Sequence, residues 1–136
     1  MKSIIVPAVQ DELDKVREFV TEELKSFECT PKAQFQMELA VEEIFVNIAS
    51  YAYSPDVGDV SVSFELSDDL VVATVTFTDH GKPFDPLAKE DADTSKEALL
   101  EREGGLGILL TKKLMDDVSY HYEDGKNILT ISKNIK

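Results

Sequence analysis

The sequence is poor in the residues that build disulfides and metal sites. Cys29 is the only cysteine among 136 residues, so an internal disulfide is excluded. His80 and His121 are the only histidines, which leaves too few ligands for a zinc site. Such sparse cysteine usage is typical of the reducing cytoplasm, and we expect the protein to work there.

Long apolar runs are also missing. No stretch approaches the roughly 18 residues that a membrane-spanning helix needs. The opening stretch, MKSIIVPAVQDELDKV, turns polar too early for a signal peptide. The sequence therefore predicts a soluble, unprocessed chain that does not contact a membrane.

Basic residues are scarce as well. The chain has 14 Lys and Arg against 27 Asp and Glu, which gives a net charge of −13. Direct nucleic-acid binding needs clustered basic residues and is not expected. A protein partner is favoured, and an anionic small ligand requires backbone amides, a metal or local cations to offset the repulsion.

The patterns of apolar residues predict a single domain over residues 1–136. Asp11 is the expected N-cap of the first helix, and Thr30 followed by Pro31 marks the start of the second. The predicted order is a strand at 3–8, helices at 11–27 and 31–51, an antiparallel hairpin of 59–66 and 70–77, a polar loop at 85–103, a helix at 104–115, and a closing hairpin of 117–124 and 126–135. The expected fold is a two-layer α/β sandwich whose mostly antiparallel mixed sheet has helices on one face.

Residues 76–86 read TFTDHGKPFDP, in which a strand ends on Asp79 and is followed by Gly81 and two prolines. Aspartate and glycine are common in surface turns, which is the ordinary reading of such a stretch. The alternative is a carboxylate that the strand delivers to a binding site.

The second predicted helix carries Glu43 and Asn47 four residues apart, on one face and along the margin of its apolar stripe. This spacing is also found at ordinary helix edges. In a site, the glutamate can orient a hydroxyl or water, and the asparagine oxygen can ligate Mg²⁺.

A glycine cluster, Gly104, Gly105 and Gly107, opens the predicted helix after the polar loop. Free amides and the helix dipole at such a start favour phosphate, and Arg102 adds a nearby cation. A flexible loop end explains the glycines equally well.

The order of these three motifs resembles the Bergerat-fold ATPases, the superfamily of gyrase, the ninety-kilodalton heat-shock chaperones and sensor histidine kinases. The box DHGKPFDP is similar to that of one compact branch, the anti-sigma factor serine kinases. The resemblance covers nearly the whole chain. One departure is Tyr51, where members of the family often carry a histidine four residues after the asparagine.

The resemblance implies roles for individual residues. Glu43 matches the general base, Asn47 the Mg²⁺ ligand and Asp79 the acceptor for the adenine amino group, with Gly81 letting the base approach closely. Residues 85–103 match a lid over the nucleotide. The remaining expected nucleotide contacts are a pocket wall of Pro83 and Phe84, a phosphate-facing turn of Arg102, Gly104, Gly105, Leu106 and Gly107, and a late-strand hydroxyl, Thr130.

The implied function is that of an ATP- and Mg²⁺-dependent serine/threonine protein kinase. Such a kinase phosphorylates a small antagonist protein on Ser or Thr and sequesters a transcription factor such as a sigma subunit. The alternatives are a non-catalytic nucleotide-binding module, a histidine kinase-type catalytic domain, and an α/β domain without a nucleotide. A second apolar strip, Phe35, Leu39 and Val46, is expected either to pack against the first helix or to form a homodimer contact.

Overall fold

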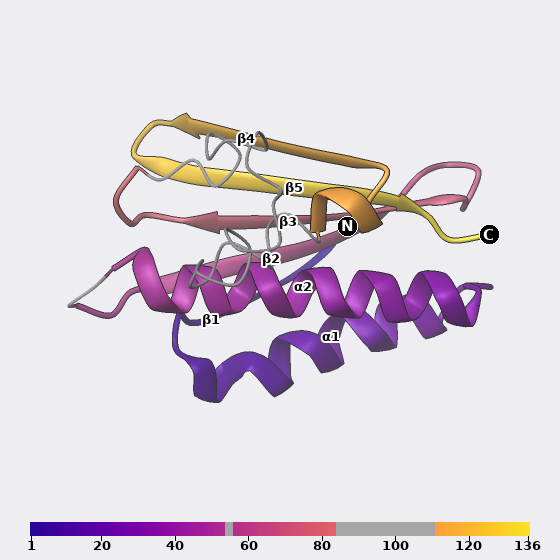
Figure 1. The fold of residues 1–136 in the computed structure, drawn as a ribbon, viewed down its shortest axis with the longest axis horizontal. Coiled ribbons are helices and arrows are strands. Elements are labelled where there is room, and N and C mark those ends of the chain that lie inside the picture. The colour runs from indigo at the N-terminus through magenta and orange to yellow at the C-terminus, as the bar shows by residue number, and fades with distance from the viewer. Residues whose placement is uncertain (54–55, 84–110) are drawn as a thin grey trace, which may run out of the picture.

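A five-stranded antiparallel sheet forms one layer of the protein, and two helices cover one of its faces (Figure 1). The computed structural model describes residues 1–53, 56–83 and 111–136. The strand order is β1-β2-β3-β5-β4. The elements are β1 (Lys2–Pro7), the 3₁₀ turn η1 (Gln10–Glu12), α1 (Leu13–Lys25), α2 (Pro31–Tyr51), β2 (Asp59–Leu66), β3 (Val72–Asp79), β4 (Asp117–Glu123) and β5 (Lys126–Asn134).

The α/β sandwich expected from the sequence is confirmed, with one difference in the sheet. All four strand pairs among the described residues are antiparallel, so the sheet is not mixed there. Pro7 ends the edge strand β1, where its missing N–H costs no ladder hydrogen bond. Both expected hairpins form, β2 with β3 and β4 with β5.

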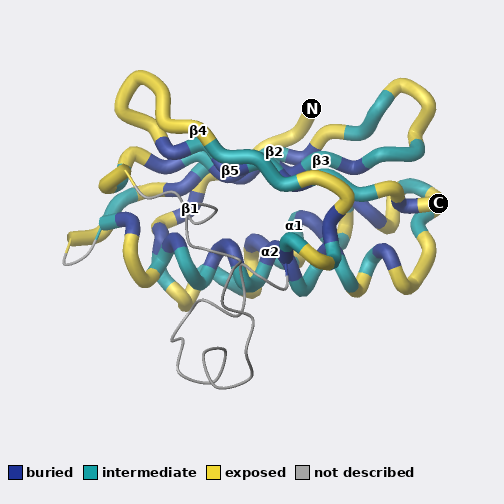
Figure 2. Tube along the Cα trace, turned by 45° about the horizontal axis from the view of Figure 1, so that its top comes forward, coloured by how far each residue is buried: buried dark blue, intermediate teal, exposed yellow. Residues whose placement is uncertain are grey.

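Alternation along the strands divides the sheet into two different faces. On β3 and β5, every second side chain is buried against the helices, as the dark segments of the tube show (Figure 2). The residues between them lie on the opposite face, where Thr74, Thr76, Thr130 and Ser132 are half-buried. This alternation decides which polar residues can reach a site on the helix side of the sheet.

Helix α2 forms the centre of the core and begins where the sequence predicts. The Ala33 amide donates to the Thr30 hydroxyl at 3.1 Å, and Pro31 occupies the first helical position. The prediction of Asp11 as the cap of the first helix is wrong. Asp11 lies within η1, and α1 is preceded by Glu12, whose side chain makes no cap bond.

No helix in the described part of the chain is long and apolar enough to cross a membrane.

Candidate functional site

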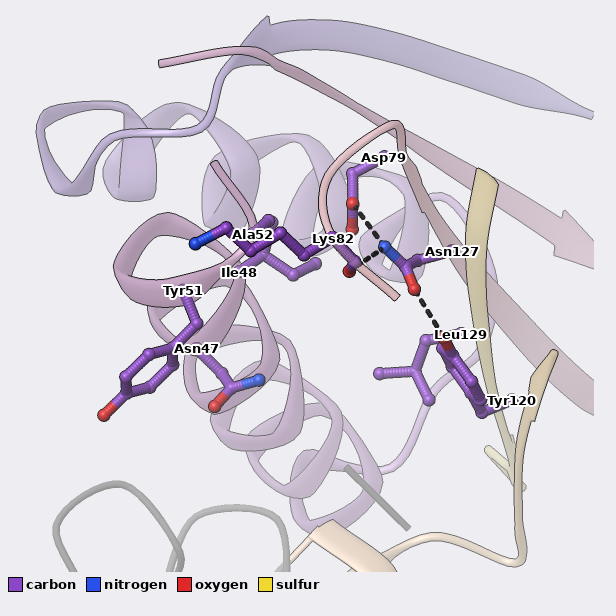
Figure 3. Close-up of a pocket in the computed structure, with 9 residues that line it drawn as sticks. All are labelled: Asn47, Ile48, Tyr51, Ala52, Asp79, Lys82, Tyr120, Asn127 and Leu129. Carbon is purple, nitrogen blue, oxygen red and sulfur yellow. Dashed lines mark hydrogen bonds between the residues drawn. The ribbon is translucent and has the colours of Figure 1, made fainter. Parts of the chain in front are cut away.

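A pocket lies on the helix side of the sheet, between the last turns of α2 and the ends of β3, β4 and β5 (Figure 3). It contains about 380 Å³ of space counting its open mouth. Tyr51 and Lys82 line it and are exposed. The lining residues are Asn47, Ile48, Tyr51, Ala52, Asp79, Lys82, Tyr120, Asn127 and Leu129.

Asp79, the last residue of β3, is a buried carboxylate with one oxygen engaged. Its side chain is only 4% exposed. Oδ1 accepts hydrogen bonds from the Gly81 amide at 2.8 Å and from Nδ2 of Asn127 at 2.9 Å. Oδ2 accepts no hydrogen bond from the described residues, and no fully buried side-chain oxygen there lacks a partner. Oδ2 is therefore an acceptor that remains open to the pocket.

Asn127 is a site residue that the sequence analysis missed. It lies directly opposite Asp79 in the β3–β5 ladder and is 6% exposed. Its Nδ2 also donates to the Lys82 carbonyl at 2.8 Å, while its Oδ1 accepts from the Tyr120 hydroxyl. A polar residue at the first inward-facing position of a strand, before Leu129 and Ile131, was the available signal.

Gly81 is required by the turn for a reason that the sequence did not reveal. A Cβ atom at this position would lie 2.2 Å from the Ala52 carbonyl oxygen at the end of α2. That carbonyl accepts from the Lys82 amide at 2.9 Å. The missing side chain thus lets the strand-end turn contact the helix backbone, which fixes one wall of the pocket.

Tyr53 also stabilises this corner, through two hydrogen bonds of its hydroxyl. Its hydroxyl accepts from the His80 amide at 2.8 Å and donates to the Asp59 carbonyl at 2.6 Å. Burial raises the pKa of the Tyr53 hydroxyl above its usual value, although the hydrogen bond from His80 opposes this shift. The end of α2 is therefore joined to the start of β2 and to the residue after Asp79.

Helix α2 brings Asn47 to the pocket, with Glu43 one turn earlier on the same face. Both side chains are half-buried, and neither is bonded to another described residue. Glu43 does not line the pocket itself. Tyr51, the departure noted in the sequence, is 46% exposed and lies on the next turn beyond Asn47.

Two other predicted site residues lie away from this pocket. Thr130 pairs with Thr76, and strand alternation places both on the sheet face opposite the helices. The expectation that Thr130 holds adenine is therefore dropped. Pro83 is exposed and does not line the pocket. The positions outside the described residues are Phe84, Arg102, Gly104, Gly105, Leu106, Gly107 and the expected lid at 85–103.

The donor set in the pocket suits Mg²⁺ better than a softer metal. No group of three His, Cys, Asp or Glu side chains within the described residues could hold a metal by itself. Mg²⁺ commonly takes one or two protein oxygens and completes its shell with water and phosphate. The unpaired side-chain oxygen of Asn47 fits that role.

A profile of the histidine kinase-like ATPase domain matches residues 6–133, nearly the whole chain. The chain belongs to this family. Within it, the chain is similar to curated proteins named serine-protein kinase RsbW, including those of Bacillus cereus and Bacillus thuringiensis subsp. konkukian. Each is 34% identical over 97 residues, which is 68% of this chain and 59% of the relative. The chain thus spans little more than half the length of these relatives.

Two solved structures share the fold of this chain. The SiaB–SiaC complex from Pseudomonas aeruginosa contains a chain with a TM-score of 0.69 and 15% identity, covering 98% of this chain and 88% of that one. The RsbU and RsbW domains of Rv1364c from Mycobacterium tuberculosis give a TM-score of 0.66 at 14% identity, covering 99% of this chain and 33% of that one. These likenesses confirm the Bergerat-type fold expected from the motifs.

Proposed function

We propose that this domain binds ATP with Mg²⁺ and transfers the γ-phosphoryl group to a serine or threonine of a small partner protein. The observation that carries the proposal is the state of Asp79. Oδ1 is held by two hydrogen bonds, and Oδ2 is an unused acceptor facing the pocket. An adenine amino group donates to such an oxygen, whereas guanine presents a carbonyl acceptor at the same position.

Phosphoryl transfer requires little covalent chemistry from the protein. The partner hydroxyl oxygen forms a bond to the γ-phosphorus, the bond from that phosphorus to the β,γ-bridging oxygen breaks, and ADP leaves. Glu43, whose carboxylate has no described partner, orients this hydroxyl and accepts its proton. Asn47 would hold Mg²⁺, which supplies charge neutralisation on the phosphates when bound.

The kinase reading is supported by the relatives named serine-protein kinases and by the family match. By analogy with them, we propose a small antagonist protein as phosphoacceptor and a sequestered transcription factor as second partner. A homodimer and a cytoplasmic location belong to the same proposal. The chain's charge of −13 fits protein partners better than nucleic acid.

Titration calorimetry with Mg²⁺ tests the nucleotide assignment. ATP should bind, while GTP and N6,N6-dimethyl-ATP, which lacks amino hydrogens, should bind at least about tenfold more weakly because Asp79 loses its donor. Asp79→Asn should weaken ATP binding by roughly 30- to 100-fold, since an amide can present a donor to a donor. Asp56→Asn, an exposed carboxylate without a described partner, is the matched control. Equal affinity for all three nucleotides would refute the assignment of Asp79.

A further inference from the structure

A second hollow lies at the opposite end of α2 from the nucleotide pocket. It contains about 660 Å³ counting its open mouth and is bounded by the first turns of α2, residues 113–116 and the end of the chain. Four lysines line it, Lys32, Lys113, Lys133 and Lys136, and we call it the lysine groove. Gln36 also lines it and lies eleven residues before Asn47, about 16 Å along the helix.

The side-chain charge of the lysine groove is opposite to that of the molecule. Among 14 basic residues in a chain of net charge −13, four converge here, and Asp116 is the only acidic side chain among the described residues that line the groove. Oδ2 of Asp116 already accepts from the Asn134 amide at 2.6 Å. The ammonium of Lys133 donates to the Leu114 carbonyl at 2.8 Å, so it is held in place.

The other three lysines are not paired with any acidic side chain of the described residues. Lys32, Lys113 and Lys136 are exposed, and their side chains make no ion pair or hydrogen bond with any described residue. Three unpaired cations around one hollow create a positive local potential within about one Debye length, roughly 10 Å at 0.1 M salt. An anionic group placed there gains attraction without having to break an existing pair.

An exposed aromatic side chain stands beside the lysine groove. Phe35 is 64% exposed and lies three residues after Lys32 on α2, so the two are neighbours on the helix surface. The polar contacts between α1 and α2 run elsewhere, through Thr21 with Glu38 and Arg17 with Glu42. The sequence predicts that the strip beginning at Phe35 either packs against α1 or forms a dimer contact. Because Phe35 is largely exposed, packing against α1 does not cover its ring. An apolar anchor beside cations is typical of protein-binding surfaces.

We infer that the lysine groove and Phe35 form a docking surface for an acidic segment of a partner protein, one that also carries an apolar side chain. The lysines match the carboxylates, and Phe35 matches the apolar residue. A short segment touches only the groove, whereas a longer nucleic acid would also meet the rest of a chain whose net charge is −13 and be repelled. This surface does not depend on the nucleotide site and goes beyond the proposed function.

Fluorescence anisotropy on the whole chain without nucleotide tests the inference. The probe is a fluorescein-labelled twelve-residue peptide of glutamates with leucine at every fourth position. It should bind at 20 mM salt and weaken steadily as salt is added, because the attraction is screened. The triple variant K32E/K113E/K136E should bind it at least about tenfold more weakly. Phe35→Ser should weaken this peptide but not an all-glutamate peptide of equal length.

The matched control is K15E/K25E/K126E, which makes the same charge change at three exposed lysines away from the groove and should shift the affinity by less than about threefold. Circular dichroism melts check that all variants remain folded. The inference fails if the wild type does not bind the peptide, or if the control loses as much affinity as the groove variant. Competition with millimolar inorganic phosphate or a 20-nucleotide single-stranded DNA gives a further test. The inference also fails if either competitor displaces the peptide from the wild type as readily as from Phe35→Ser, because Phe35 would then contribute nothing to binding.

Discussion

The side-chain nitrogen Nδ2 of Asn127 donates to Oδ1 of Asp79 at 2.9 Å, directly across the β3–β5 ladder. Both side chains are buried at the inner end of the pocket (Figure 3). The bond occupies one carboxylate oxygen and leaves the other open to a ligand. Asn127 is in turn held by the Tyr120 hydroxyl, so the acceptor of the site is positioned by two strands that follow it in the chain.

Asn127→Leu should weaken both the fold and the site. The leucine keeps the branched shape but removes the donor, which leaves Oδ1 of a buried carboxylate with a single partner. We expect a loss of about 1–3 kcal/mol in unfolding free energy and at least about a fivefold loss in ATP affinity. Urea denaturation and calorimetry measure the two effects.

The control for Asn127→Leu is Thr130→Val, on the same strand but the opposite sheet face. It should leave ATP affinity unchanged within about twofold, because Thr130 does not face the pocket. If Thr130→Val lost ATP affinity and Asn127→Leu did not, the facing of β5 described above would be contradicted.

Gly81→Ala should disrupt the corner between β3 and α2. The added Cβ would lie 2.2 Å from the backbone oxygen of Ala52, the same oxygen that accepts the Lys82 hydrogen bond, so moving the two backbones apart would weaken that bond. We expect at least about 2 kcal/mol of destabilisation and loss of nucleotide binding. Gly125→Asn is the comparison, since Gly125 has a φ of +75° and open space around it, and asparagine tolerates that conformation. Thermal melts in which both variants behave alike would show that the contact with Ala52 is unimportant.

The raised pKa of the Tyr53 hydroxyl predicts that the free energy of unfolding falls at alkaline pH. The folded pKa of its hydroxyl is raised, so its stabilisation is complete below the pKa of unfolded tyrosine, about 10, and is lost as pH rises through the folded pKa. The main cause of the raised pKa is burial, which disfavours the charged phenolate. A phenolate also cannot donate to the Asp59 carbonyl. Tyr53→Phe should lower stability by about 1 kcal/mol at pH 7 and narrow its difference from wild type above pH 10.

Urea denaturation of the Tyr53 variant at pH 7, 9 and 11 follows this difference. Tyr122→Phe, an exposed tyrosine without a described partner, should show no such convergence with wild type. A constant gap between wild type and Tyr53→Phe across this range would rule out the proposed role of its proton.

Local signals in the sequence predicted most of the fold. The pair Thr30-Pro31 marked the start of α2, and the helical spacing of its apolar residues predicted that it continues to Tyr51. The β-branched runs marked both hairpins. Glu43, Asn47 and Asp79 were found because each belongs to a motif of fixed spacing. The structure places Asn47 and Asp79 in one pocket, with Glu43 one turn before Asn47.

The rest depended on register and on long-range contact, which one sequence does not show. Asn127 is 48 residues from Asp79, and their pairing requires β5 to lie beside β3 in one particular register. A one-residue shift in that register would have turned Thr130 inward instead. The contact between Gly81 and Ala52 likewise exists only once the helix has packed on the sheet.

Single-turnover transfer of labelled phosphate from ATP to the partner protein tests the central claim most directly. Candidates for the partner are small single-domain proteins encoded beside this one. Glu43→Gln should keep ATP affinity within about threefold, because Glu43 does not line the nucleotide pocket, yet slow transfer by roughly 10²-fold or more. Glu42→Gln, the adjacent carboxylate that faces Arg17, should transfer at nearly the wild-type rate. Transfer unaffected by Glu43→Gln, or a wild type that binds ATP and its partner but never moves phosphate, would contradict the account.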